Sequence, residues 1–199
     1  MNKENASIQQ LINYFKHLFP LDDKECYEIT SRLAERKIRR NQFILQDGDV
    51  CRHFTFVVSG CFKMFAVDKN GKAHNLQFAA ENDWITDLSS FYSEKASTVF
   101  IEAIERSEIL QIKHDDLLYL YVNYHKFDRN FRVVIEQKYI EMQNRVLHNI
   151  SSTAEERYIT FLQQYPNLSG RLPNTQIASY LGITPEFLSK IRREMTLRP

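Results

Sequence analysis

The spacing of apolar residues changes twice along the chain. In residues 7–34 apolar side chains recur at intervals of three and four, which predicts helices. Pro20 separates two of them, and Asp22 or Asp23 can cap the second, whose last apolar residue is Leu33. The chain therefore opens with a helical segment.

Between about residues 35 and 113 the pattern becomes one of short apolar and β-branched runs separated by turns. Asp47-Gly48-Asp49 is one such turn, and Asn70-Gly71 is a strong hairpin signal. The expected strands are 42–45, 54–58, 62–67, 75–79, 98–104 and 109–113. Strands of this length and spacing predict an antiparallel sandwich or barrel.

Helical spacing returns after the β block. Asp115 and Asp116 begin a short helix over 117–122, and a longer helix runs from about Phe127 to Asn149. An apolar stripe follows the longer helix, and its residues include Phe131, Ile135, Tyr139, Met142 and Val146. This stripe can pack on the β block of the same chain or on a second copy of the helix.

Residues 151–153 break the long helix. Ser152 with Glu155, or Thr153 with Glu156, forms a capping box that starts a new helix running through Tyr165. We therefore expect two domains, residues 1–150 and residues 151–199, with the hinge at this break.

The last stretch predicts two short helices around a tight turn. Ala178 and Leu181 lie on the apolar face of the first helix, and Gly182 allows the positive φ of a sharp turn. Thr184 and Pro185 suit the cap and first position of the second helix. This spacing is typical of a DNA-binding helix-turn-helix.

Polar and basic side chains face outward once Leu188 and Ile191 pack inward. Glu186 can accept a hydrogen bond from cytosine, while Ser189, Lys190 and the following arginines can contact bases or phosphates. The candidate DNA-binding residues are Thr175, Gln176, Thr184, Pro185, Glu186, Ser189, Lys190, Arg192 and Arg193. We expect Arg192 to anchor phosphates rather than read bases. The alternative is an ordinary helical hairpin with a solvated basic face.

Composition indicates a soluble globular protein. The chain is 43% hydrophobic and 26% charged, and its net charge of +1 means that attraction to nucleic acid must come from local charge. No apolar run approaches the roughly 20 residues of a membrane span, and the polar start is no signal peptide. Cys26, Cys51 and Cys61 form no C-x-x-C pair, so we expect packing residues in a reducing cytoplasm.

Several motifs of the β block resemble the double-stranded β-helix, or jelly roll, of the cyclic-nucleotide-binding domain. They are Ile44-x-x-x-Gly48-Asp49, then Phe56-Val57-Val58-Ser59-Gly60-Cys61-Phe62-Lys63-Met64-Phe65, then Asn70-Gly71-Lys72. With the terminal helix-turn-helix, nearly the whole chain resembles the Crp/Fnr family of bacterial transcription regulators. The resemblance implies an α+β fold: a jelly-roll sensor domain, a long dimerisation helix and a helix-turn-helix domain.

The resemblance also implies partners. In the family the long helix pairs with its twin, so Phe131, Ile135, Tyr139, Met142 and Val146 would form a homodimer seam. The dimer would bind double-stranded DNA at an inverted repeat, and would contact RNA polymerase if it is an activator. The family's β-hairpin wing would be absent here, or built only from Gly170–Pro173.

Cyclic AMP is not expected as the ligand. Family members that bind it present Gly-Glu and, some ten residues later, an Arg followed by a small hydroxylic residue; here Thr86, Asp87 and Ser97 occupy the Gly, Glu and Arg positions. A small-molecule effector of unidentified class, if one exists, would contact Phe65, Gln77, Trp84, Asp87, Leu88, Ser89, Ser97 and Thr98. The cysteine cluster of oxygen-sensing members is absent, and no cofactor is expected.

The jelly roll also occurs in metal-binding cupins, which need a His-x-His pair. None of the six histidines forms this pair, so we expect no enzyme, no catalytic residue and no metal site. A regulatory module that binds a ligand without acting through DNA is the alternative function. The terminal helix-turn-helix favours DNA binding over that alternative.

Overall fold

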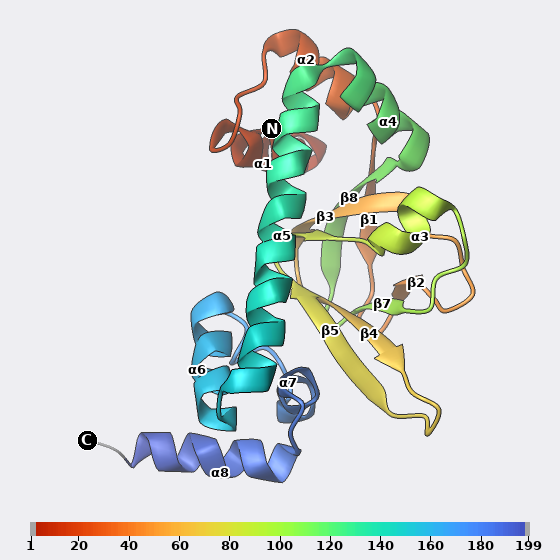
Figure 1. The fold of residues 1–199 in the computed structure, drawn as a ribbon. Coiled ribbons are helices and arrows are strands. Elements are labelled where there is room, and N and C mark those ends of the chain that lie inside the picture. Colours follow the sequence, from red (N-terminus) through yellow and green to blue (C-terminus); the bar gives the residue numbers. More distant parts are fainter. Residues whose placement is uncertain (1–2, 198–199) are drawn as a thin grey trace. The chain divides into compact units, whose positions relative to one another are not determined.

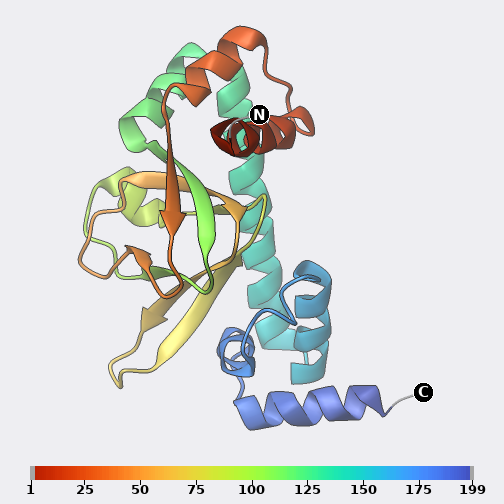
Figure 2. The ribbon, with the colours of Figure 1, turned by 180° about the vertical axis from the view of Figure 1, so that it is seen from behind.

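The computed structural model describes residues 3–197 and shows the α+β class predicted from the sequence (Figures 1 and 2). The described residues divide into two compact units. The first, the roll unit, comprises the residues up to Met64 together with Phe78–Gln137. The second, the C-terminal unit, comprises Phe65–Gln77 and the residues from Lys138 onward.

Two helices begin the roll unit, α1 (Lys3–Lys16) and α2 (Asp23–Thr30). Asp22 caps α2 through a capping box, because its carboxylate accepts from the Glu25 amide at 2.9 Å and the Glu25 carboxylate accepts from the Asp22 amide at 2.8 Å. The helix ends before Leu33, which belongs to the first strand, so the predicted continuation of the helix to Leu33 is wrong.

Eight strands in the described residues form two four-stranded sheets. They are β1 (Leu33–Ile38), β2 (Phe43–Leu45), β3 (His53–Ser59), β4 (Phe62–Val67), β5 (Ala73–Ala79), β6 (Trp84–Ile85), β7 (Phe100–Ala103) and β8 (Ser107–Lys113). The sheet orders are β1-β8-β3-β6 and β2-β7-β4-β5. Six strands overlap the predicted runs, whereas β1 and β6 were not predicted.

Aromatic residues form the core of the roll unit on one face of the first sheet. The ring of Trp84 lies 5.2 Å from that of Phe54 and 5.0 Å from those of Phe56 and Phe131. Phe15 of α1 joins the same cluster, and Phe15, Phe56 and Phe131 are fully buried. Edge-to-face contacts of this kind add to the free energy gained by burial.

The turn between β3 and β4 requires a glycine. Gly60 has φ of +94°, and a Cβ atom there would lie 2.1 Å from Ser107 Oγ and 2.8 Å from the Arg106 carbonyl oxygen. The turn at Ser59-Gly60 therefore depends on both backbone conformation and close packing against the start of β8.

Six further helices lie in the described chain: α3 (Leu88–Ser93), α4 (His114–Asn123), α5 (His125–Ser151), α6 (Ala154–Gln164), α7 (Asn174–Leu181) and α8 (Pro185–Thr196). The boundary between the two compact units falls within α5. Of the two capping boxes considered for α6, the one formed is that of Thr153 with Glu156. The two buried cysteines, Cys51 and Cys61, and the half-buried Cys26 are free thiols.

Candidate nucleic-acid interface

The helix-turn-helix is built from α7 and α8 in the C-terminal unit (Figure 1). Gly182 ends α7 in the left-handed conformation, with φ of 69°, and the Ile183 amide donates to the Ala178 carbonyl at 3.0 Å. Thr184 caps α8, since its side chain accepts from the Phe187 amide at 3.2 Å, and Pro185 occupies the first helical position. The local sequence thus fixes the angle between the two helices.

Apolar residues hold α8 against α7 and leave one face of α8 to solvent. The residues buried in this contact are Ile177, Ala178, Leu181, Leu188 and Ile191. The exposed face carries Glu186, Ser189, Lys190 and Arg193. This arrangement can present acceptors and cations to the edges of bases and to phosphates.

The exposed side chains of α8 make only weak contacts with their own helix. Lys190 lies 3.8 Å from Glu194, and both are about half exposed, so solvent weakens this ion pair. Ser189 donates from its hydroxyl to the Pro185 carbonyl at 2.9 Å. Glu186 and Arg193 are exposed. These side chains can therefore turn toward a ligand at little cost.

Arg192 behaves differently from Arg193. It is half-buried, its guanidinium lies 5.4 Å from the centre of the Tyr158 ring, and it reaches the Ser169 carbonyl at 3.5 Å. Its expected role as a phosphate anchor stays a prediction, and the geometry adds a structural role that the sequence did not indicate.

Gln176 on α7 is bonded to the β4–β5 hairpin, of which residues 65–77 belong to the same unit. The Asn75 side-chain amide donates to the Gln176 carbonyl at 2.9 Å and to Gln176 Oε1 at 2.8 Å. The Ser179 hydroxyl accepts from the Asn75 amide at 3.1 Å and donates to the Ala73 carbonyl at 3.0 Å. Thr175, the other candidate on α7, is exposed.

Arg145 of α5 completes this contact. Its guanidinium donates to the carbonyls of Asn75, at 2.8 Å, and Tyr180, at 3.0 Å, and also to that of Leu76. It lies 4.0 Å from the centre of the Tyr180 ring. Burial raises the pKa of Tyr180, and the charge of Arg145 partly opposes that rise. One guanidinium therefore links three segments of the C-terminal unit.

Sequence reasoning missed both Asn75 and Arg145. Asn75 lay inside an expected strand, and Arg145 lay on the long helix outside the predicted apolar stripe. The sequence offers only a weak signal, a polar asparagine inside an expected strand. Its 2% exposure, which implies a partner for its amide, is seen only in the structure.

The apolar stripe of α5 is exposed only along its second half. Phe131 is fully buried in the roll-unit core, and Ile135 is half-buried. The exposed fractions beyond them are 61% for Tyr139, 65% for Met142 and 54% for Val146. Ile140, Leu147 and Ile150 extend this exposed surface. An apolar face of this extent that stays exposed among residues 3–197 is suited to an interface with another molecule.

In the region expected to hold a cyclic phosphate, the polar side chains are hydrogen-bonded to one another and to nearby backbone amides. Asp87 caps α3 by accepting from the Ser89 and Ser90 amides, and its other oxygen accepts from the Ser97 hydroxyl at 2.8 Å. Ser97 is buried and also accepts from the Val99 amide at 3.1 Å. The Asp87 carboxylate and the Ser97 hydroxyl, which would face a nucleotide, are thus hydrogen-bonded to each other.

The remaining residues of the expected effector pocket are divided between the two units. Trp84 is buried in the aromatic core, Leu88 packs against that core, and Ser89 and Thr98 are exposed, all in the roll unit. Phe65, which is buried, and Gln77, which is half-buried, belong to the C-terminal unit.

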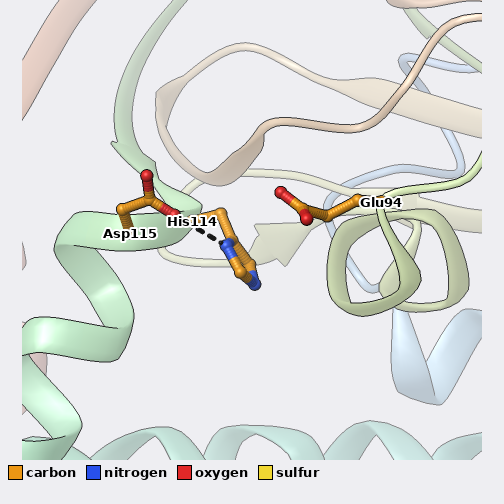
Figure 3. Close-up of side chains that lie close together, drawn as sticks. All are labelled: Glu94, His114 and Asp115. Atoms are coloured by element: carbon orange, nitrogen blue, oxygen red, sulfur yellow. Dashed lines mark hydrogen bonds and ion pairs between the residues drawn. The ribbon is translucent and has the colours of Figure 1, made fainter.

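One cluster in the roll unit has the side chains of a metal site. Ligand atoms of Glu94, His114 and Asp115 lie within 4.8 Å of one another, and Asp115 Oδ1 is 3.1 Å from His114 Nδ1 (Figure 3). The Asp115 side chain is 96% exposed, and Glu94 is exposed. Such exposed acidic groups are common beside a histidine without a metal, so we assign no metal to this cluster.

The chain thus combines a β-roll with a C-terminal helix-turn-helix. Residues 35–124 match the cyclic nucleotide-binding domain family. The chain is 24% identical over 170 residues to the transcriptional activator protein Anr of Pseudomonas protegens, covering 78% of this chain and 68% of Anr.

Solved structures show the same fold. FixK2 of Bradyrhizobium japonicum aligns with a TM-score of 0.71 and 19% identity, over 82% of this chain and 84% of FixK2. A transcriptional regulator of the Crp/Fnr family from Eubacterium rectale aligns with a TM-score of 0.68 and 15% identity, over 89% and 84% of the two chains. The chain is therefore similar in sequence to Anr and shares its fold with FixK2 and with the Crp/Fnr-family regulator from Eubacterium rectale.

No helix in the described part of the chain has the length and apolarity needed to cross a membrane.

Proposed function

We propose that this protein is a sequence-specific DNA-binding transcription regulator that acts as a homodimer in the cytoplasm. The observation that carries the proposal is the exposed face of α8, where Glu186, Ser189, Lys190 and Arg193 stand on a helix buried on its other side. An α-helix fits the major groove of B-DNA, and these side chains match the acceptors and donors of base edges.

The exposed half of the α5 stripe supports the dimer. Two chains paired through Tyr139, Met142 and Val146 would present two copies of α8 to DNA. In a two-fold dimer the recognition helices lie about one helical turn, roughly 34 Å, apart. The target is then an inverted repeat, and RNA polymerase is a further partner if the protein is an activator.

The division of labour follows the expected domains. Residues 1–150 would form the sensor and dimer region, and residues 151–199 the DNA-binding domain. Cyclic AMP is not the effector in this proposal, because no arginine stands at Ser97 and because Ser97 is bonded to Asp87. Calorimetry that detects micromolar binding of cyclic AMP would contradict this part.

Selection from randomised DNA tests the proposal most directly. Glu186→Ala should relax the preference at one base pair in each half-site, with about 1–3 kcal/mol of discrimination lost. Arg192→Ala should weaken binding to all sequences alike and flatten its salt dependence. Because Arg192 also packs over the Tyr158 ring, the Arg192→Ala variant should also have a lower thermal stability than the wild-type protein.

The matched control is Glu136→Ala, which removes an exposed carboxylate from α5. It should leave the selected motif and the affinity unchanged. If no motif emerges for the wild-type protein, DNA reading by α8 is refuted. If Arg192→Ala changes the motif and Glu186→Ala does not, the reading and anchoring roles are reversed.

A further inference from the structure

A cavity in the roll unit borders the region expected to hold an effector, because its lining residues Gly48 and Asp49 form backbone hydrogen bonds with Ser97. It has a volume of about 420 Å³, within the range of small-molecule sites. Arg36 of β1, His53 and Thr55 of β3 and Gln111 of β8 line one side. Leu45 of β2 and Ile101 of β7 line the other, and none of the eight residues expected around an effector lines it.

A chain of hydrogen bonds crosses this side of the cavity. Thr55 and Gln111 face each other across β3 and β8, and are 2% and 3% exposed. Gln111 Nε2 donates to Thr55 Oγ1 at 2.9 Å, and Gln111 Oε1 accepts from Arg36 Nη1 at 2.8 Å. Buried polar groups cost stability unless they are bonded, and here the bonds hold a guanidinium at the cavity.

The cavity is rich in positive charge. Arg36 and Arg52 both line it and are exposed at its rim, and Asp49 is the acidic residue among its lining residues. The half-buried His53 has a lowered pKa, chiefly because of burial and then because Arg36, Lys113 and Arg52 disfavour a further charge. A neutral His53 can donate a hydrogen bond without adding to this repulsion.

We infer that this cavity binds a small organic molecule carrying an oxyanion, held by the guanidinium groups of Arg36 and Arg52. The planar fork of arginine matches the two oxygens of a carboxylate or a phosphate. Arg36 is already oriented by Gln111, so less side-chain entropy is lost when the anion binds. If the anion is the effector of the regulator, that extension rests on the proposed function; the binding site itself does not.

The binding test uses the full-length protein without DNA. Citrate and glycerol 3-phosphate are titrated by calorimetry at constant ionic strength, with sodium chloride as the control. We expect saturable binding of one of them and a rise in thermal stability with its concentration. Binding of citrate alone assigns a carboxylate ligand, and binding of glycerol 3-phosphate alone assigns a phosphate ligand. If neither binds more tightly than chloride, the inference is overturned.

Variants locate the site. Arg36→Gln and Arg52→Gln should each weaken binding by about tenfold or more, because each removes hydrogen bonds to a charged group. Arg39→Gln and Arg40→Gln are the matched controls, since both residues are exposed and neither lines the cavity. If the controls weaken binding as much, the anion binds the general surface charge and the site is refuted.

Nuclear magnetic resonance of His53 provides a readout that does not depend on stability. A bound anion beside the imidazole should raise its pKa, since it stabilises the imidazolium form. The His53 signal is assigned by its loss in His53→Gln. An unchanged His53 titration at saturating anion would contradict binding in this cavity. DNA affinity is measured separately, so failure of the DNA-binding proposal leaves this result intact.

Discussion

Replacing Arg145 by methionine should loosen the C-terminal unit and leave the roll unit unchanged. The substitution removes the donors to the carbonyls of Asn75, Leu76 and Tyr180 and the contact with the Tyr180 ring, while the methionine keeps most of the apolar stem. Hydrogen bonds to a charged group contribute about 1.5–3 kcal/mol each.

The expected loss is smaller than the sum of three such bonds. Arg145 is half exposed, so water replaces part of what is lost, whereas the nearby Asn75 is only 2% exposed. We expect the free energy of unfolding of the C-terminal unit to fall by about 2–4 kcal/mol. For a unit of this size, that corresponds to a fall of roughly 10 °C or more in its melting temperature.

Two spectroscopic signals distinguish the unfolding of the C-terminal unit from that of the roll unit. Trp84 is the chain's one tryptophan and lies in the core of the roll unit, so its fluorescence reports on that unit. Far-ultraviolet circular dichroism also reports on α6, α7 and α8. In Arg145→Met the dichroism should begin to fall at a lower temperature, while the fluorescence transition stays at the wild-type value.

The control is Arg132→Met on the same helix. Arg132 is 61% exposed and lies 3.8 Å from Glu136, so its charge contributes little. If dichroism and fluorescence of Arg145→Met both show the wild-type transition temperature, the three hydrogen bonds to carbonyls add no measurable stability. That result would refute the prediction. An equal effect of Arg132→Met would show that α5 responds to any loss of charge.

Three further predictions concern other parts of the chain. Gly60→Ala should lower the free energy of unfolding of the roll unit by about 3 kcal/mol, because its Cβ would meet Ser107; an unchanged denaturation midpoint by Trp84 fluorescence would disprove this. Val146→Glu should dissociate the proposed dimer, and a tight dimer in sedimentation would place its interface elsewhere. Hydrogen bonds from Thr153 lower the pKa of Glu156, so the capping box should stabilise α6 above about pH 4.3 and lose this effect as the pH falls through the lowered pKa. Glu156→Gln should remove that acid dependence, as measured by helix content.

Local sequence signals predicted the elements that depend on local chemistry. The turn at Gly182 and the cap at Thr184 formed as expected, and of the two capping boxes left open the one of Thr153 with Glu156 formed. Each depends on residues within a few positions of one another, where backbone conformation and short-range hydrogen bonds decide the outcome.

The missed strands have physical reasons. The sequence of β1, Leu33-Ala34-Glu35-Arg36-Lys37-Ile38, is largely charged and exposed, and it is stabilised by pairing with β8 rather than by its own apolar residues. The strand β6 is only Trp84–Ile85, too short to produce a periodic pattern. Both β1 and β6 form because they pair with strands distant in sequence, and the β-propensity of their own residues does not reveal that pairing.

The contacts around the candidate sites were equally beyond local reasoning. Asn75 and Gln176 are 101 positions apart, and Thr55 and Gln111 are 56 apart. Polar residues inside expected strands gave no indication of which partner they would meet. Phe131 shows the reverse case: its spacing placed it on a dimer stripe, but the fold uses its ring in the roll-unit core.

The bonds between Ala73–Leu76, Arg145 and α7 bear on how this protein can be re-engineered. A chimera that joins a foreign DNA-binding domain after residue 150 would keep Asn75 and Arg145 but lose the Gln176, Ser179 and Tyr180 groups that they bond. Its buried asparagine amide would then face an unmatched helix. A graft that also carries the donor's hairpin and the second half of its long helix would preserve these contacts. The part of this protein that can be exchanged as a unit is therefore discontinuous in sequence.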